Sequence, residues 1–194
     1  MEQMQIASSS TTYLASVNDR RQLLARSIGV SAIHEASLLG NAYSWTAVNA
    51  NIDAADTALL VANTSNIMNL VIQRAYVWAD IATLVQIHCP VAATVATPYT
   101  GTGVVGVNLN RNFANNAPAV AWADETVNAL VAAQVIESVY CRLETNGEIT
   151  TAVGVPIDFK EGVILGNGDA IAIDVVTEMT GFEATFVGYF IPKE

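Results

Sequence analysis

Midway along the chain the sequence reads Gly101-Thr-Gly-Val-Val-Gly-Val-Asn-Leu-Asn-Arg-Asn112, and Trp122-Ala-Asp-Glu-Thr126 follows shortly after. Glycine and asparagine here separate short runs of β-branched residues, a pattern typical of strands bounded by turns. We interpret residues 122–126 as an acidic turn. Similar short runs of Val, Thr, Ile and Ala lie on both sides, so the sequence predicts an all-β domain.

Turn-forming residues recur about every eight to twelve positions after Ala42, which suits a β-sandwich or barrel. Two turns stand out, at Asn146-Gly147 and at Gly166-Asn-Gly-Asp169, and each predicts a hairpin. Residues 171, 173 and 175 alternate with Ala172 and Asp174 as in a half-buried strand. A helix over residues 126–138 remains an alternative to a strand there. We expect strands at residues 43–48, 57–62, 67–78, 83–89, 103–109, 133–143, 149–154, 163–165, 170–178 and 183–191.

Residues 1–40 differ from the sandwich domain that we place at residues 41–194. Residues 31–40 predict the one short helix, because Ser31 can cap it and Gly40 can end it. The preceding segment contains three of the eight basic residues of the chain. We interpret it as an extended N-terminal arm that docks as an added strand or as a short helix begun by Asp19, with a disordered tail as the alternative. Its candidate contact residues are Arg20, Arg21, Leu23, Leu24 and Arg26.

The composition is apolar and thinly charged. Hydrophobic residues make up 52% of the 194 residues and charged residues 13%, with a net charge of −10. Monomeric surfaces are usually about 25–35% charged, so we expect the protein to self-associate. Twelve acidic and three basic residues follow position 111, which argues against nucleic acid or an anionic membrane as partner. We find no secretion signal and expect a soluble protein made in a cytoplasm.

The motifs that could carry chemistry are weak. Gly101-x-Gly103-x-x-Gly106 matches the dinucleotide fingerprint, but strand-like residues follow it where a helix is required. His88, Cys89 and Cys141 lack the ligand number and spacing of a zinc site. Asn63-Thr-Ser65 is a glycosylation sequon on paper and indicates a turn. We expect no catalytic residues, no metal and no cofactor.

A row of polar residues is a better candidate for a functional site than these motifs. Asn108 and Asn110 alternate on a predicted strand, and Arg111 follows at the start of a loop. Amide groups both donate and accept hydrogen bonds, so a row of them suits a contact between subunits or a glycan surface. A solvent-facing strand is the alternative.

Several segments of the sequence resemble those of the jelly-roll decoration, or cement, proteins of tailed bacteriophages. They are Gly40-Asn-Ala-Tyr-Ser-Trp-Thr-Ala47, residues 53–65, residues 103–111, Ala123-Asp-Glu-Thr126, and residues 163–174 followed by Phe186-Val-Gly-Tyr-Phe190. The resemblance covers roughly residues 40–190. It implies a two-sheet jelly roll, usually trimeric, that sits on the exterior of the phage head and clamps neighbouring major capsid proteins.

The expected function is therefore structural: a virion protein on the capsid exterior, made in the cytoplasm of the bacterial host, with the major capsid protein and itself, as a homotrimer, for partners. The first alternative is a head-fibre or tail-associated virion protein that binds host-surface glycans. The second is an enzyme on a jelly-roll scaffold, and we expect the protein not to be one, since the fold alone implies no activity.

Overall fold

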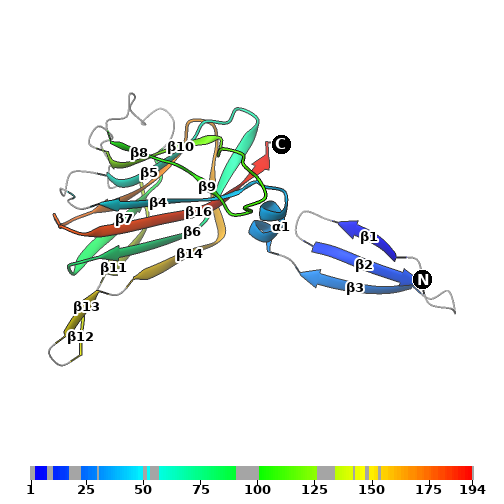
Figure 1. Cartoon of the computed structure of the whole chain (residues 1–194), viewed down its shortest axis with the longest axis horizontal. Coiled ribbons are helices and arrows are strands. Elements are labelled where there is room, and N and C mark those ends of the chain that lie inside the picture. The colour runs from blue at the N-terminus through cyan, green and yellow to red at the C-terminus, as the bar shows by residue number, and fades with distance from the viewer. Residues whose placement is uncertain are drawn as a thin grey trace.

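A computed structural model describes residues 3–7, 11–17, 23–29, 31–49, 52, 57–90, 101–125, 134–141, 143–146, 149–152 and 154–193. Figure 1 shows a β-sandwich, the short helix α1 at one end of it and, beyond that helix, a small separate sheet. The elements are β1 (Gln3–Ala7), β2 (Thr11–Val17), β3 (Leu23–Gly29), α1 (Ala32–Leu38), β4 (Ala42–Asn49), β5 (Thr57–Asn63), β6 (Met68–Ala79), β7 (Thr83–His88), β8 (Thr102–Val104), β9 (Val107–Asn108), β10 (Ala119–Glu125), β11 (Val135–Cys141), β12 (Leu143–Asn146), β13 (Ile149–Ala152), β14 (Val155–Leu165), β15 (Ala170–Val175) and β16 (Phe182–Pro192).

Two antiparallel sheets form the sandwich. Within the described ranges, one has six strands in the order β11-β7-β15-β5-β10-β8, and the other has five in the order β14-β6-β16-β4-β9. The strand pairs β4–β16, β5–β15, β6–β14 and β7–β11 are nested. In each successive pair, the first strand comes later in the sequence and its partner comes earlier. The all-β sandwich prediction is confirmed.

The core lies between the two sheets. β16 alternates between buried and half-buried residues along its length, and Phe182 and Phe186 face the core with no exposed surface. Trp45 of β4 joins them, and Val61 and Ile171 of the other sheet belong to the same cluster. This alternation is what a strand with one face on the core requires.

The strand β15 departs from the prediction. Residues 171, 173 and 175 face the main core, but Ala170 and Ala172 are also fully buried, in a second cluster on the opposite face. The half-buried interpretation is therefore wrong for this strand, since Ala170 and Ala172 pack with Leu60 and Ala62 of β5 and with Val120 on the far face of the sheet. Alternation of large and small residues resembled alternation of buried and exposed ones.

The predicted hairpins differ in outcome. β12 and β13 pair in antiparallel register with Asn146 opposite Ile149, which confirms a hairpin around Asn146-Gly147, although residues 147 and 148 lie outside the described part. The turn at Gly166–Asp169 is not a hairpin. It joins β14 of the five-stranded sheet to β15 of the six-stranded sheet, with Gly168 at a φ of 82°.

Two further segments differ from the prediction. Residues 119–125 form β10, which pairs with β5 and β8. The acidic turn predicted at residues 122–126 is therefore wrong for residues 122–125, which belong to this strand. The predicted strand at residues 103–109 is interrupted, because β8 belongs to one sheet and β9 to the other. The helix alternative at residues 126–138 falls partly outside the described residues, and β11 is a strand from Val135 onward.

The predicted helix is confirmed as α1. The Ser31 side chain accepts a hydrogen bond from the backbone N–H of His34 at 3.4 Å, and Gly40 follows the helix with a φ of 74°. Ala36 is the buried residue of the helix. With a single buried residue on such a short helix, its stability depends on contacts with β16 and β4.

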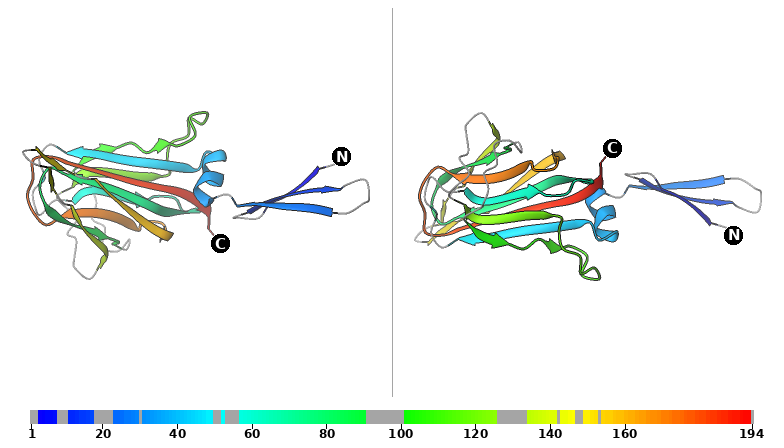
Figure 2. Two further views of the ribbon diagram at one scale, coloured as in Figure 1. Left: turned by 90° about the horizontal axis from the view of Figure 1, so that it is seen from below. Right: turned by 90° about the horizontal axis from the view of Figure 1, so that it is seen from above.

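The N-terminal segment forms an antiparallel sheet of β1, β2 and β3 within the described residues. All three views of Figures 1 and 2 place this sheet beyond α1, away from the two sheets of the sandwich. The alternative of a short helix is wrong for residues 23–29, which are a strand. Asp19 lies outside the described part.

Candidate interaction surface

The opening stretch of the sequence lies along one edge of the sandwich. β8 ends the six-stranded sheet, the chain crosses at Val105-Gly106, and β9 ends the five-stranded sheet beside β4. A Cβ at residue 106 would lie 2.5 Å from Nε1 of Trp45, so only glycine allows this close crossing. The residues that match a dinucleotide fingerprint therefore lead from strand to strand, without a helix to hold a pyrophosphate.

Asparagines stabilise the turn after β9 instead of forming an outward row. Asn108 is 8% exposed, and its Nδ2 donates to the carbonyl oxygen of Gly40 at 2.7 Å. Its Oδ1 accepts from the backbone N–H of Asn110 at 2.9 Å, and Oδ1 of Asn110 accepts from that of Asn112 at 3.1 Å. These are Asx turns. The prediction that Asn108 and Asn110 project together from one strand face is wrong, since the amides turn the chain.

Apolar side chains are exposed along the same edge. Val105 and Val48 are 77% and 76% exposed, and three further large apolar residues of the segment from β9 to the turn are also exposed. They are Val107, Leu109 and Phe113. Arg111 is exposed in the turn between them. We call Val48, Val105, Val107, Leu109 and Phe113 the apolar edge, and exposed apolar groups gathered in this way are typical of contact surfaces.

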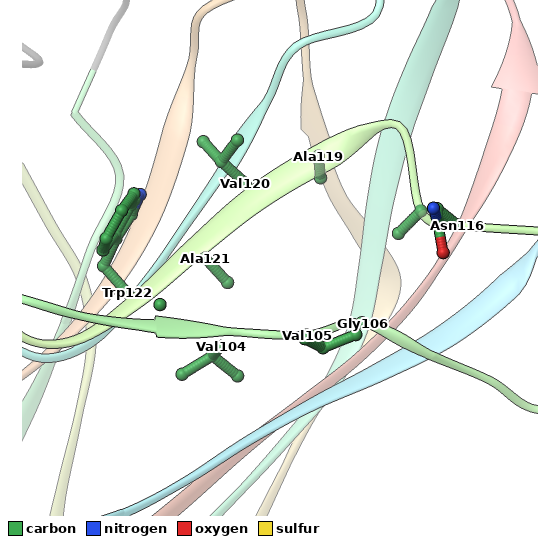
Figure 3. Close-up of a pocket in the computed structure, with 10 residues that line it drawn as sticks. Val104, Val105, Gly106, Asn116, Ala119, Val120, Ala121 and Trp122 are labelled. Carbon is green, nitrogen blue, oxygen red and sulfur yellow. The ribbon is translucent and has the colours of Figure 1, made fainter.

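Two shallow pockets border the apolar edge. The first, of about 430 Å³, lies over β8 and β10 and is lined by uncharged residues, including Asn116 and Trp122. Figure 3 shows the Trp122 ring and Val120 on one side of β10, and Val104 directed away from them. The second pocket, of about 330 Å³, lies between β4 and β8 and is lined by Thr46, Val48, Thr102 and Val105 among others.

A third pocket, of about 480 Å³, lies beside α1. Leu39 of the helix end and Tyr189 to Pro192 of β16 form half of its lining, and Glu35 is its one charged lining residue. Leu38, Leu39 and Ile67 are exposed near this end of the molecule. It follows that the sandwich offers apolar surface at the end from which the N-terminal sheet leaves.

The structure describes three of the five candidate contact residues of the N-terminal arm. Arg20 and Arg21 lie outside the described residues. Leu23, Leu24 and Arg26 belong to β3, opposite Val17, Ser16 and Leu14 of β2. The structure therefore separates them from the sheet that holds Asn108, and the candidate contact residues do not form one site.

The residues considered for metal or acid–base chemistry are also apart. His88 pairs with Val135 at one end of the β7–β11 ladder, and Cys141 pairs with Thr83 at the other. In the described part of the chain, no three His, Cys, Asp or Glu side chains gather as metal ligands. His88 is 2% exposed, and its Nε2 lies 3.6 Å from Oδ2 of Asp174, too far for a good hydrogen bond.

Burial changes the titration of four groups. It raises the pKa of the Cys141 thiol, and burial together with the Asp169 carboxylate raises that of Cys89. Burial likewise raises the pKa of Tyr189 and of Tyr43. At Tyr43, a hydrogen bond with the Asn108 side chain lowers the pKa and offsets part of this rise. The thiols therefore carry less thiolate than free cysteine at the same pH, which makes them poor nucleophiles.

These shifts predict that the protein loses stability in alkali. Well below the ordinary thiol pKa of about 8.5, a free thiol keeps its proton, and folded and unfolded chains bind equal numbers of protons at these groups. Above it the unfolded chain releases protons that the folded chain retains, so the free energy of unfolding falls as the pH rises. Urea titrations from pH 7 to 10 measure this, and Cys141→Ala should remove part of the decline. A constant or rising stability over this range would contradict the shifts.

Comparison of the chain with protein-family models, with curated proteins and with solved structures finds no match. No helix within the described residues has the length and apolar character needed to span a membrane.

Proposed function

We propose that this protein is a structural component of a tailed-phage particle, a cement protein that binds the outside of the head and strengthens contacts between major capsid proteins. The sandwich would be a jelly roll. The nested strand pairing supports this topology, because four strands β4 to β7 pair antiparallel, in reverse order, with four later strands, as in one long folded hairpin. Three copies would associate, as the resemblance implies.

The apolar edge is the observation that carries the proposal. Five exposed apolar side chains follow one another along β4, the β8–β9 crossing and the turn after β9. Apolar area removed from water contributes about 25 cal/mol per Å², so a surface of this kind favours a protein neighbour over solvent. Attachment repeated over several copies multiplies weak contacts into strong retention.

The N-terminal segment would provide the second contact. Residues 1–30 contain three arginines and two acids, whereas the remaining chain carries a net charge of −11, given −10 in total. A sheet that stands clear of its own sandwich can reach a neighbouring protein (Figure 2). Arg20, Arg21 and Arg26 would pair with capsid carboxylates, each exposed pair contributing about 0–1 kcal/mol.

We expect the full-length protein to co-sediment with purified heads of its own phage and to raise the temperature at which they rupture. The variant Arg20→Glu/Arg21→Glu/Arg26→Glu should bind heads at least about tenfold more weakly, because three attractive contacts become repulsive. Lys160→Glu/Lys193→Glu is the control and should bind normally. Normal binding by the arginine variant would refute docking by the arm, and no binding by the wild type would refute the cement function.

The glycan-binding alternative rests on the pocket at Trp122, where an aromatic ring and the Asn116 amide are both present. Sugars bind to such combinations of an apolar face and hydrogen-bonding groups. A glycan array with the full-length protein distinguishes the two functions. Binding that Trp122→Ala abolishes, without attachment to heads, would favour the alternative.

A further inference from the structure

The N-terminal sheet of β1, β2 and β3 has one apolar face. In an antiparallel sheet, paired residues share a face and successive residues of a strand alternate between faces. One face contains Gln3, Gln5, Ser16 and Arg26 among its positions. We call the opposite face, which contains no charged residue, the apolar arm face. Its apolar positions are Met4, Ile6, Tyr13, Ala15, Val17, Leu23 and Ala25.

The apolar arm face needs a cover. A sheet with one apolar face is stable when that face packs against another layer. Figures 1 and 2 show the sheet of β1, β2 and β3 as a single layer beyond α1, clear of both sheets of the sandwich. The surface that covers it must therefore be one that the sheet does not contact within its own chain.

The pocket of about 480 Å³ beside α1, which we call the α1 groove, is a matching surface. Leu39 lines it and is 63% exposed, and Ile67, next to the lining residue Met68, is 71% exposed. Glu35 is the one charged residue of the lining. An apolar groove bordered by a single acid suits an apolar surface that belongs to a basic segment.

The arm cannot turn back onto the α1 groove of its own chain. Residues 30 and 31 alone connect β3 to α1, and the groove begins at Ala32. Ser31 is extended, with φ −65° and ψ 145°, as an N-cap residue must be to accept its hydrogen bond. Two residues span at most about 7 Å, whereas three strands are about 14 Å wide. A reversal here would therefore remove the cap of α1.

Charge also favours another copy of this chain as the source of the cover. Residues 1–30 carry +1, from three arginines and two acids, and residues 31–194 carry −11, which together give −10. Two sandwiches therefore repel each other, whereas the arm of one copy and the sandwich of another attract each other.

We propose that the apolar arm face of each copy packs into the α1 groove of a neighbouring copy. The two surfaces differ, so the contact is heterologous and continues from copy to copy until a ring closes. This contact deepens the proposed function and rests on it only for the number of copies, since a homotrimer closes the ring at three. Arg26 belongs to the opposite face of the arm and stays available to the capsid.

Lysine substitutions in the full-length protein test both surfaces. Leu23→Lys on the apolar arm face and Leu39→Lys in the α1 groove should each weaken self-association at least about tenfold in sedimentation equilibrium, because each buries a charge in an apolar contact.

Each of these variants has a neighbouring leucine as its matched control. Leu24 belongs to the opposite face of the arm, and Leu38, 62% exposed, does not line the groove. Leu24→Lys and Leu38→Lys should change the association constant less than about twofold, as surface substitutions usually do. Equal effects within either pair, or no effect of Leu23→Lys and Leu39→Lys, would overturn the proposal.

Cross-linking between chains shows which copy supplies the arm. Tagged Leu23→Cys and untagged Leu39→Cys full-length proteins, when co-expressed, should be joined by a short bismaleimide. Leu24→Cys in place of Leu23→Cys should cross-link at least about tenfold less, because its position belongs to the other face. The native Cys89 and Cys141 are present in every variant and cannot explain a difference.

The outcomes separate this contact from the proposed function. A double variant Leu23→Cys/Leu39→Cys that cross-links only within its own chain would show that each arm covers its own groove, and would overturn the exchange. A wild-type protein that stays monomeric would overturn it as well, even if that protein binds heads. Failure of an associated wild-type protein to co-sediment with heads would refute the cement function and leave the exchange supported.

Discussion

Trp45→Ala should destabilise the protein by about 3–5 kcal/mol, the usual cost of truncating a buried aromatic residue. Trp45 has no exposed surface, contacts the Tyr43 ring at a centroid distance of 6.1 Å, and supports the crossing at Gly106. Its loss leaves a cavity beneath β4 and the apolar edge together. Urea denaturation followed by far-ultraviolet circular dichroism measures the change.

Trp45→Phe is the matched control. The indole Nε1 of Trp45 is buried without a hydrogen-bond partner in the described part of the molecule. Phenylalanine removes that unsatisfied donor while it retains most of the aromatic volume, so the loss should stay within about 1.5 kcal/mol. Equal losses for the alanine and phenylalanine variants would show that ring packing is not the main contribution.

Asn63→Asp should cost about 3–5 kcal/mol although the two side chains have nearly the same shape. Asn63 is fully buried, and its Nδ2 donates to the carbonyls of Met68 and Leu165, each at 3.0 Å. An aspartate cannot donate these bonds, and its charge would face two carbonyl oxygens. Urea denaturation at pH 7 and pH 4 measures the loss, which should be smaller at pH 4 because a protonated carboxyl donates one bond.

The control for this substitution is Asn167→Asp. Asn167 is exposed in the nearby turn between β14 and β15, and surface changes of this kind alter stability by about 0.5 kcal/mol or less. A similar loss in both variants would mean that added negative charge, and not the buried amide, is responsible. The burial of Asn63 also excludes it as a glycan acceptor in the folded protein, although its sequence forms a sequon.

Asn63 shows why some contacts that hold the fold together could not be predicted. Its backbone N–H donates to the Asp169 carbonyl at 3.0 Å, and its carbonyl accepts from Gly168 at 2.7 Å. One residue thus joins the end of β5 to a turn more than a hundred positions away. A local pattern of Asn, Thr and Ser indicates a turn and cannot show which distant carbonyls the amide will meet. Asn108 is a similar case, since its partner Gly40 is distant in sequence.

Local chemistry determined the strand periodicity, the capped helix and the hairpin at Asn146, because alternation, capping and turn geometry depend on neighbouring residues. Tertiary structure alone decided that residues 119–125 form a strand, that Gly166–Asp169 crosses between sheets, and that β8 and β9 end different sheets. These depend on pairings such as Thr46 with Thr185, 139 positions apart. A strand's place in its sheet is decided by the free energy of the whole core, which no short segment encodes.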